Sequence, residues 1–149
     1  MTSNTAPSGV CSASNAPINS SATFDIYKAF DGNGITRYSS ELNPSNPSIS
    51  YKFTNPVCVK KIYLDSYVEH LKNFKIQASN DQSSWVDLYS GINNSMPISI
   101  GDNYQEHRQF TTKITNNDYY LYYRLAQTSY YNNNYISIWE IQFYGRSQN

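Results

Sequence analysis

Oxygen-donor side chains cluster in one short glycine-rich stretch, Asp31-Gly32-Asn33-Gly34-Ile35-Thr36. Asp31, Asn33 and Thr36 supply carboxylate, amide and hydroxyl oxygens, and the two glycines allow the backbone to curl so that these oxygens converge. Calcium takes about 6–8 oxygen ligands, whereas zinc prefers nitrogen and sulfur. An EF-hand is excluded because Ile35 falls on a ligand position and neither flank is helical. The stretch therefore predicts a calcium site, and a metal-free turn is the alternative.

A second group combines aromatic rings with amides in the stretch Tyr130-Tyr131-Asn132-Asn133-Asn134-Tyr135. Proteins commonly hold sugars by stacking an aromatic ring on the apolar face of the sugar and by hydrogen bonding its hydroxyls with planar polar groups. Tyr130, Tyr131, Asn132 and Tyr135 offer both kinds of contact, which indicates a carbohydrate-binding loop. The alternative is a solvated Asn-rich loop whose tyrosines pack on the core.

The sequence gives little support for a catalytic site. The two histidines, His70 and His107, fall in different expected elements, and neither has a Ser or Cys nucleophile motif near it. Carboxylates are scattered, and no two of them have a spacing that singles them out as a glycosidase pair. The sequence therefore predicts a protein without catalytic residues, which is not an enzyme.

These groups need a scaffold, and the spacing of apolar residues indicates one made of strands. Short alternating runs recur between clusters of Asn, Ser, Pro, Gly and Asp, which is typical of an all-β sandwich or barrel. Helices are expected to be nearly absent. The expected strands span Ile49–Phe53, Val57–Ser66, Phe74–Ser79, Trp85–Tyr89, Gln105–Ile114, Tyr119–Gln127 and Ile136–Tyr144.

Length and charge limit the remaining possibilities. The 149 residues suit one domain, and we expect a mobile tail over residues 1–10, a single domain over residues 11–145 and a second tail over residues 146–149. A formal net charge of zero provides no basic field for nucleic acid. No run reaches the roughly 20 apolar residues of a membrane span, and Met1–Pro17 has no signal-peptide pattern.

The two cysteines, Cys11 and Cys58, are too few for a disulfide framework. We expect two inert thiols, with Cys58 packed in a strand between Val57 and Val59. A single bridge that pins the N-terminus is the alternative.

Three separated segments, 28–38, 74–88 and 138–145, share their order and spacing with one known family. Lys28–Tyr38 is similar to the family's opening motif, Ala-x-Asp-Gly followed by Thr-x-Trp, with Tyr38 in place of Trp. Phe74–Asp81 and Trp85 are similar to its strand, turn and Trp. Ile138–Gly145 is similar to its closing strand. Together they resemble the discoidin family, also called the coagulation-factor (F5/8) type C domain. This family includes galactose-binding-like carbohydrate-binding modules of bacterial glycosidases.

The resemblance implies an antiparallel jelly-roll β-sandwich whose loops gather at one end to bind ligand. It adds the Lys28 carbonyl and Glu140 to Asp31, Asn33 and Thr36 as ligands of a structural calcium ion. It also implies that three loops form the binding end, with Ser39 and Glu41 in one, Tyr67, Glu69 and His70 in another, and Tyr130, Tyr131, Asn132 and Tyr135 in the third. Galactose-binding members often carry His soon after the Thr-x-Trp motif, and the absence of His here argues against galactose.

The predicted function is a non-catalytic, lectin-like module that recognises a glycan or glycoconjugate, alone or within a multidomain chain. The alternative is a virion or cell-surface assembly or adhesion protein that uses the same sandwich to bind protein. Either function predicts an extracellular, cell-surface or virion location. Phospholipid binding is less favoured because the candidate loops hold mainly Tyr, Asn and Ser.

Overall fold

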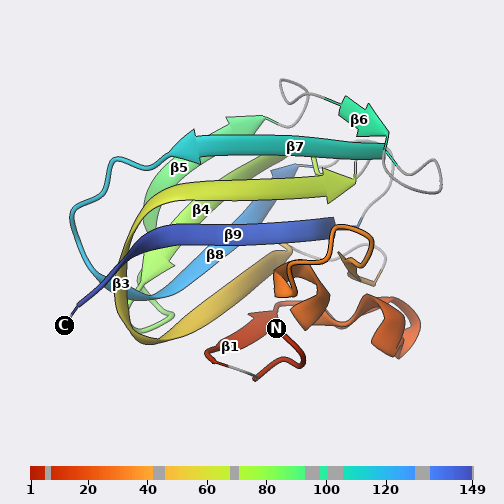
Figure 1. Ribbon diagram of the computed structural model, residues 1–149, viewed down its shortest axis with the longest axis horizontal. Helices are drawn as coiled ribbons and strands as arrows, with labels where there is room; N and C mark the ends of the chain where they lie inside the picture. The colour runs from red at the N-terminus through yellow and green to blue at the C-terminus, as the bar shows by residue number, and fades with distance from the viewer. Residues whose placement is uncertain are drawn as a thin grey trace.

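The computed structural model describes residues 1–5, 8–41, 46–67, 71–92, 98–100, 106–129 and 135–148, and for residues 98–100 and 106 it describes the backbone alone. Antiparallel strands dominate these ranges (Figure 1). The helical turns among them are the short 3-10 helices η1 (Ile18–Ser20), η2 (Ala22–Phe24) and η3 (Ile26–Phe30). The expected all-β class is confirmed.

The longest strand, β3 (Ser48–Tyr67), belongs to both layers of the fold. Its first part pairs with β1 (Val10–Ala13) and β8 (Tyr120–Ser129), and its second part pairs with β7 (Glu106–Lys113) and β9 (Ser137–Ser147). The register with β8 shifts between Lys52 and Val57. Pro56 lies within this shift, where the N–H that proline lacks is not needed by a regular ladder. The sequence predicted two strands here, but the chain stays extended while it changes partners.

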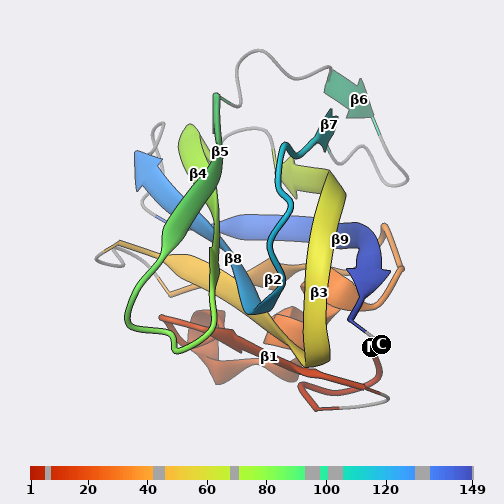
Figure 2. The same ribbon diagram turned by 90° about the vertical axis from the view of Figure 1, so that its left-hand side faces the viewer.

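Two facing layers result (Figure 2). One contains β1, the first part of β3, β8, β4 (Asn73–Ser79) and β5 (Val86–Ile92). The other contains β6 (Ile98–Ile100), β7, the second part of β3, β9 and β2 (Tyr38–Ser39). The antiparallel sandwich is thereby confirmed. The sequence pattern did not predict β1, β2 or β6, because strands this short show little alternation.

The core fills the space between the layers, where alternate residues of each strand point inward. Burial is nearly complete for Ile49, Ile62, Leu64, Phe74, Ile76, Tyr123, Leu125, Ile138 and Ile141. Cys11 and Cys58 are buried, free thiols, as predicted, so they do not form the alternative bridge. Burial raises the pKa of the Cys11 thiol to about 11, which makes it a poor nucleophile at neutral pH.

Residues of the expected N-terminal tail make contacts near η3. The Met1 amino group donates to the carbonyl of Phe30 at 2.7 Å, and the Asn4 amide donates to Asp25 at 3.0 Å. Strands β1 and β9 extend slightly beyond the expected domain limits at residues 11 and 145; those limits stay a prediction. No helix in the described part of the chain is long and apolar enough to cross a membrane.

Candidate functional site

The glycine-rich stretch forms a turn held by its own polar side chains. Asp31 Oδ1 accepts the N–H of Asn33 at 2.9 Å, and Asp31 Oδ2 accepts the Thr36 hydroxyl at 2.7 Å. Gly32 has a φ of 73°, a left-handed conformation that favours glycine. The turn thus brings the predicted donors Asp31, Asn33 and Thr36 together. Lys28 lies in η3, directly before this turn, with its ammonium 4.8 Å from the Tyr27 ring centroid.

Glu140 joins the turn from β9, although it is 108 residues away from Gly32 in sequence. Its Oε2 accepts the N–H of Gly32 at 2.9 Å, and the residue is only 5% exposed. Burial, together with the nearby charge of Asp31, raises the pKa of Glu140 to about 7, although the Gly32 N–H opposes the shift. The structure therefore places the buried Glu140 carboxylate near the half-buried Asp31 carboxylate, and the two repel each other when both are ionised.

This donor set fits a hard cation. Among the described residues, His, Cys, Asp and Glu do not gather in groups of three or more, so the ligands besides Asp31 and Glu140 must be carbonyl, amide or hydroxyl oxygens. Calcium is bound by such mixtures of oxygens. Glu140 also borders two hollows of about 360 and 300 Å³, of which the first is shared with Asp31 and the second with Asp65.

Arg37 is the centre of a second cluster, at the end of the sandwich where β9 begins. Its guanidinium carbon lies 4.7 Å from the ring centroid of Trp139 and 5.7 Å from that of Tyr67, and its Nε donates to Ser39 Oγ at 3.2 Å. Burial lowers the pKa of Arg37, while Tyr135 and Tyr67 act in the opposite direction. Arg37 thus lies close to residues from all three predicted binding loops.

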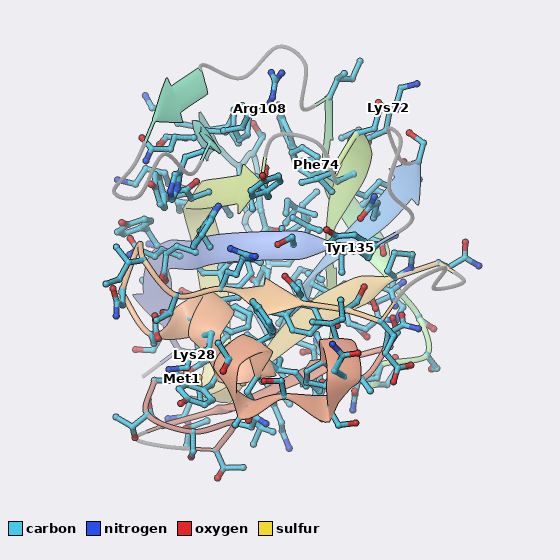
Figure 3. The ribbon with its side chains drawn as sticks, turned by 90° about the vertical axis from the view of Figure 1, so that its right-hand side faces the viewer. Met1, Lys28, Lys72, Phe74, Arg108 and Tyr135 are labelled. Carbon is cyan, nitrogen blue, oxygen red and sulfur yellow. The ribbon has the colours of Figure 1, made fainter. Side chains whose placement is uncertain are left out.

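Hydrogen bonds tie two of those loops together. Ser39 Oγ and Ser137 Oγ lie 2.8 Å apart, and the Ser40 hydroxyl accepts the N–H of Ile136 at 3.1 Å. Ser39 and Ser137 are buried, whereas Glu41 next to them is exposed and Tyr135 is half-buried. Figure 3 views the sandwich from this end and labels Tyr135.

Trp139, which contacts Arg37, belongs to a group of buried side chains that the sequence did not predict. The His107 ring stacks on Trp139 with centroids 4.5 Å apart, and His107 Nδ1 lies 3.0 Å from both carboxylate oxygens of Asp65. Burial raises the pKa of Asp65, while hydrogen bonds from Gln109 and His107 act in the opposite direction. Within the described residues no hydrogen bond joins His107 to a Ser or Cys.

A β-bulge explains why Trp139 points at His107. In the β3–β9 ladder, Asp65 pairs with Glu140 and Ser66 pairs with Ile138, which leaves Trp139 as an extra residue. A bulge turns the inserted side chain away from the face that strict alternation gives it. Alternation alone therefore could not predict that Trp139 and Glu140 both contribute to the candidate sites. For Glu140 the sequence signal was the family resemblance, and for Trp139 it was the presence of an aromatic residue beside an acidic one in the closing strand.

The predicted binding residues divide into two groups. Ser39, Glu41, Tyr67 and Tyr135 lie at one end of the sandwich, on segments that meet around Arg37. The predicted residues that lie outside the described ranges are Glu69, His70, Tyr130, Tyr131 and Asn132. Arg37 and Trp139, which the sequence did not single out, are the side chains that connect the described members.

Fold and site together define an antiparallel β-sandwich with a loop-built end. Residues 10–141 match the F5/8 type C domain, and the chain belongs to this family. No curated protein sequence matches the chain.

Solved structures share the fold. Chitosan-binding module 1 of a chitosanase/glucanase from Paenibacillus sp. IK-5 is 24% identical with a TM-score of 0.72, over 95% of this chain and 98% of that one. Module 2 of the same enzyme, in complex with chitotriose, is 23% identical with a TM-score of 0.71, over 95% and 100%. The CBM32 module of AlyQ, in complex with 4,5-unsaturated mannuronic acid, is 20% identical with a TM-score of 0.69, over 93% and 95%. These structures are of carbohydrate-binding modules.

Proposed function

We propose that this chain is a non-catalytic module that binds a glycan at the end of the sandwich around Arg37. The observation that carries the proposal is the position of Arg37 between Tyr67 and Trp139, with its Nε bonded to Ser39. Segments that are far apart in the sequence meet there, and each contributes a residue type that commonly binds sugars in proteins. Solved structures of the same fold, which bind chitosan, alginate fragments and pectin, support a glycan as the ligand.

The chemistry of this end suits a sugar ring. Tyr67 and Tyr135 offer aromatic faces to the apolar side of a pyranose, and Ser39 and Glu41 offer acceptors and donors to its hydroxyls. The Arg37 guanidinium is planar and presents several N–H groups, so it can hold a pair of neighbouring oxygens. Glu69, His70, Tyr130, Tyr131 and Asn132 belong to the same proposal on the basis of the sequence.

The proposal includes a structural calcium ion held by Asp31, Glu140, Thr36 and the carbonyls of Lys28 and Asn33. Bound there, calcium would supply the positive charge that offsets the repulsion between the two carboxylates. Such a crosslink closes a loop of more than 100 residues, for which chain entropy gives an upper bound of about 4–5 kcal/mol. We expect calcium to raise the melting temperature, and Asp31→Ala to remove that increase. Equal melting temperatures with added calcium and with chelator, where elemental analysis shows that the chelator-treated protein has lost its calcium, would contradict the site.

A module of this kind works outside the cell, and we place the chain there, attached to a larger protein or displayed on a surface.

The test of the binding function is a glycan array that includes chitosan, alginate and pectin oligosaccharides. We expect binding to at least one class, and we expect the Tyr130→Ala/Tyr131→Ala double variant to lose it while keeping its melting temperature. Tyr122→Ala, a half-buried tyrosine of β8 beside Lys52, is the matched control.

Two outcomes would overturn parts of this proposal. An array without any hit for the calcium-loaded wild type would favour the alternative, a surface assembly or adhesion protein that binds protein. If the double variant unfolds, the two tyrosines serve the core and the binding site must be sought at Tyr67 and Arg37.

A further inference from the structure

A groove lies beside β9 at the end of the strand remote from Arg37. Its volume is about 460 Å³, and it is lined by Lys60, Lys61, Tyr144, Gly145 and Arg146. Figure 1 shows β9 running toward the C-terminus, and the groove is lined by residues at that end of the strand. Five residues at about 3.4 Å each separate Trp139, which contacts Arg37, from Tyr144 in the groove, or roughly 17 Å. No acidic side chain is among the lining residues.

The groove owes its shape to a second bulge in the β3–β9 ladder. Val59 pairs with Gly145 and Lys61 pairs with Tyr144, which leaves Lys60 as the extra residue. The bulge lets Lys60 and Lys61, although adjacent in sequence, both line the groove. A Cβ at Gly145 would come within 2.3 Å of the Cys58 carbonyl oxygen, so glycine is needed for the close approach of the strands. Its missing side chain also keeps the groove open.

Basic side chains face one another across this part of the sheet. Lys61 pairs with Lys113 on β7 and with Tyr144 on β9, so the three residues form a row. Like charges directly opposite on neighbouring strands destabilise a sheet. The ion pairs within the described residues are Lys75–Asp87 and His107–Asp65, so none of the described carboxylates offsets this row. A bound anion would offset the positive charge of this row.

Tyr144 supplies the aromatic part of the groove. It is 42% exposed, its hydroxyl is bonded to Gln142, and the Lys61 ammonium lies 4.1 Å from its ring centroid. The ring is therefore held by its hydroxyl group and by the Lys61 ammonium over one face, while a large part of the residue stays exposed. A pyranose can pack against that surface while a carboxylate on the sugar reaches the ammonium group of Lys61, which lines the groove. Lys113 does not line the groove, but as the partner of Lys61 in the sheet it adds positive charge beside it.

We propose that this groove is a second glycan site, which binds a uronic-acid residue of an acidic polysaccharide. The inference rests on the proposed function in that it takes a glycan as the ligand, but it uses none of the residues around Arg37. Nucleic acid suits the groove less well, because a net charge of zero gives no extended basic field. A membrane surface suits it less well, because no Trp, Phe or Leu lines it.

The test is a calorimetric and NMR titration with trigalacturonic acid, and with its methyl ester as the uncharged ligand. We expect the acid to shift the amide signals of residues 60–61, 113 and 144–146, and the ester to bind at least tenfold more weakly. The Lys61→Gln/Lys113→Gln double variant should lose a similar factor, because both substitutions are on exposed side chains and should keep the fold. Lys52→Gln, an exposed lysine stacked on Tyr122, is the matched control and should bind like the wild type.

Each contrary result has a definite meaning. Equal binding of acid and ester, or equal binding by the double variant and wild type, would overturn the site. So would binding of a DNA oligonucleotide or of anionic phosphatidylserine vesicles at these residues in preference to the uronate. The same titration on Tyr67→Ala separates the two proposals: shifts at residues 60–61 and 144–146 should persist there even if the end around Arg37 binds nothing.

Discussion

Both ends of β9 pair with β3, but they differ in burial and in the side chains that surround them. At its start, Ser137, Trp139 and Glu140 are buried, and Trp139 lies against both His107 and Arg37. At its end, residues 144–147 are exposed and border an open basic groove. Both ends carry a bulge in the ladder with β3, one on β9 at Trp139 and one on β3 at Lys60. The same local irregularity thus produces a packed cluster in one place and a groove in the other.

Stability and ligand recognition are coupled at one end of β9 and separate at the other. At the start of β9 the residues proposed to bind ligand share contacts with buried aromatic and charged groups, so a substitution there should change both folding and binding. At the end of β9 the proposed ligand contacts are exposed lysines and one tyrosine. Substitutions there should change binding alone.

The largest expected effect is that of Trp139→Ala. This side chain is 1% exposed and stacks on His107, so its removal should lower the free energy of unfolding by about 3–5 kcal/mol. Tyr144→Ala, its counterpart at the other end, should cost less than about 1 kcal/mol because the ring is 42% exposed. Urea unfolding of both variants measures the contrast. Equal losses would mean that the two ends are equally coupled to the core.

The next effect is a pH dependence that belongs to the start of β9. In the calcium-free protein the folded-state pKa of Glu140 is raised to about 7 from 4.5. Its contribution to stability is therefore complete below pH 4.5 and is lost as the pH rises through 7, by on the order of 3 kcal/mol. Calcium should reverse the trend, because it binds the ionised carboxylate.

Unfolding curves between pH 4.5 and 8, with and without chelator, check this prediction. Glu140→Gln should flatten the calcium-free curve, and any slope that remains has the sign expected for Asp65, whose pKa is raised in the same direction. A wild-type curve that rises with pH in the presence of chelator would show that Glu140 is not the buried, repelled carboxylate described above.

Glycine substitutions give a smaller contrast. Gly145→Ala places a Cβ within 2.3 Å of the Cys58 carbonyl oxygen, and we expect a loss of about 1–3 kcal/mol as the strands move apart. Gly34→Ala meets no atom within 4 Å and should be close to neutral. Thermal melts of the two variants compare them. A neutral Gly145→Ala would show that the close approach beside the groove is not needed.

The smallest effect concerns the row of like charges. Lys61→Gln removes the repulsion between Lys61 and Lys113 but also the contact with the Tyr144 ring, and each is worth only a few tenths of a kcal/mol to about 1 kcal/mol. We expect the stability to change by less than about 0.5 kcal/mol, with an increase more apparent at low salt. A loss of several kcal/mol in chemical unfolding would mean that this lysine supports the fold rather than a ligand.

The sequence predicted the parts of the molecule that follow regular periods. Strands β4, β7, β8 and β9 lie where the pattern of apolar residues predicted them. Glu140 accepts a hydrogen bond from the glycine-rich turn, and its role as a calcium ligand, which the family resemblance implies, stays a prediction. The contributions of Trp139 and Lys60 could not be predicted, because each is the extra residue of a bulge and a bulge breaks the alternation that assigns faces. Arg37 was missed because its partners come from β3 and β9, which only the tertiary fold brings to it.

The proposed glycan site lies where β9 begins, and its ligand contacts surround Arg37. The most direct test is an NMR titration of the calcium-loaded protein with the best glycan from the array, with backbone amides assigned. We expect shifts at residues 37–41, 65–67 and 135–139, and unchanged signals at residues 10–12, 50–52 and 122–124, where β1, β3 and β8 pair in the other layer. Shifts confined to that other layer, with none around Arg37, would contradict it.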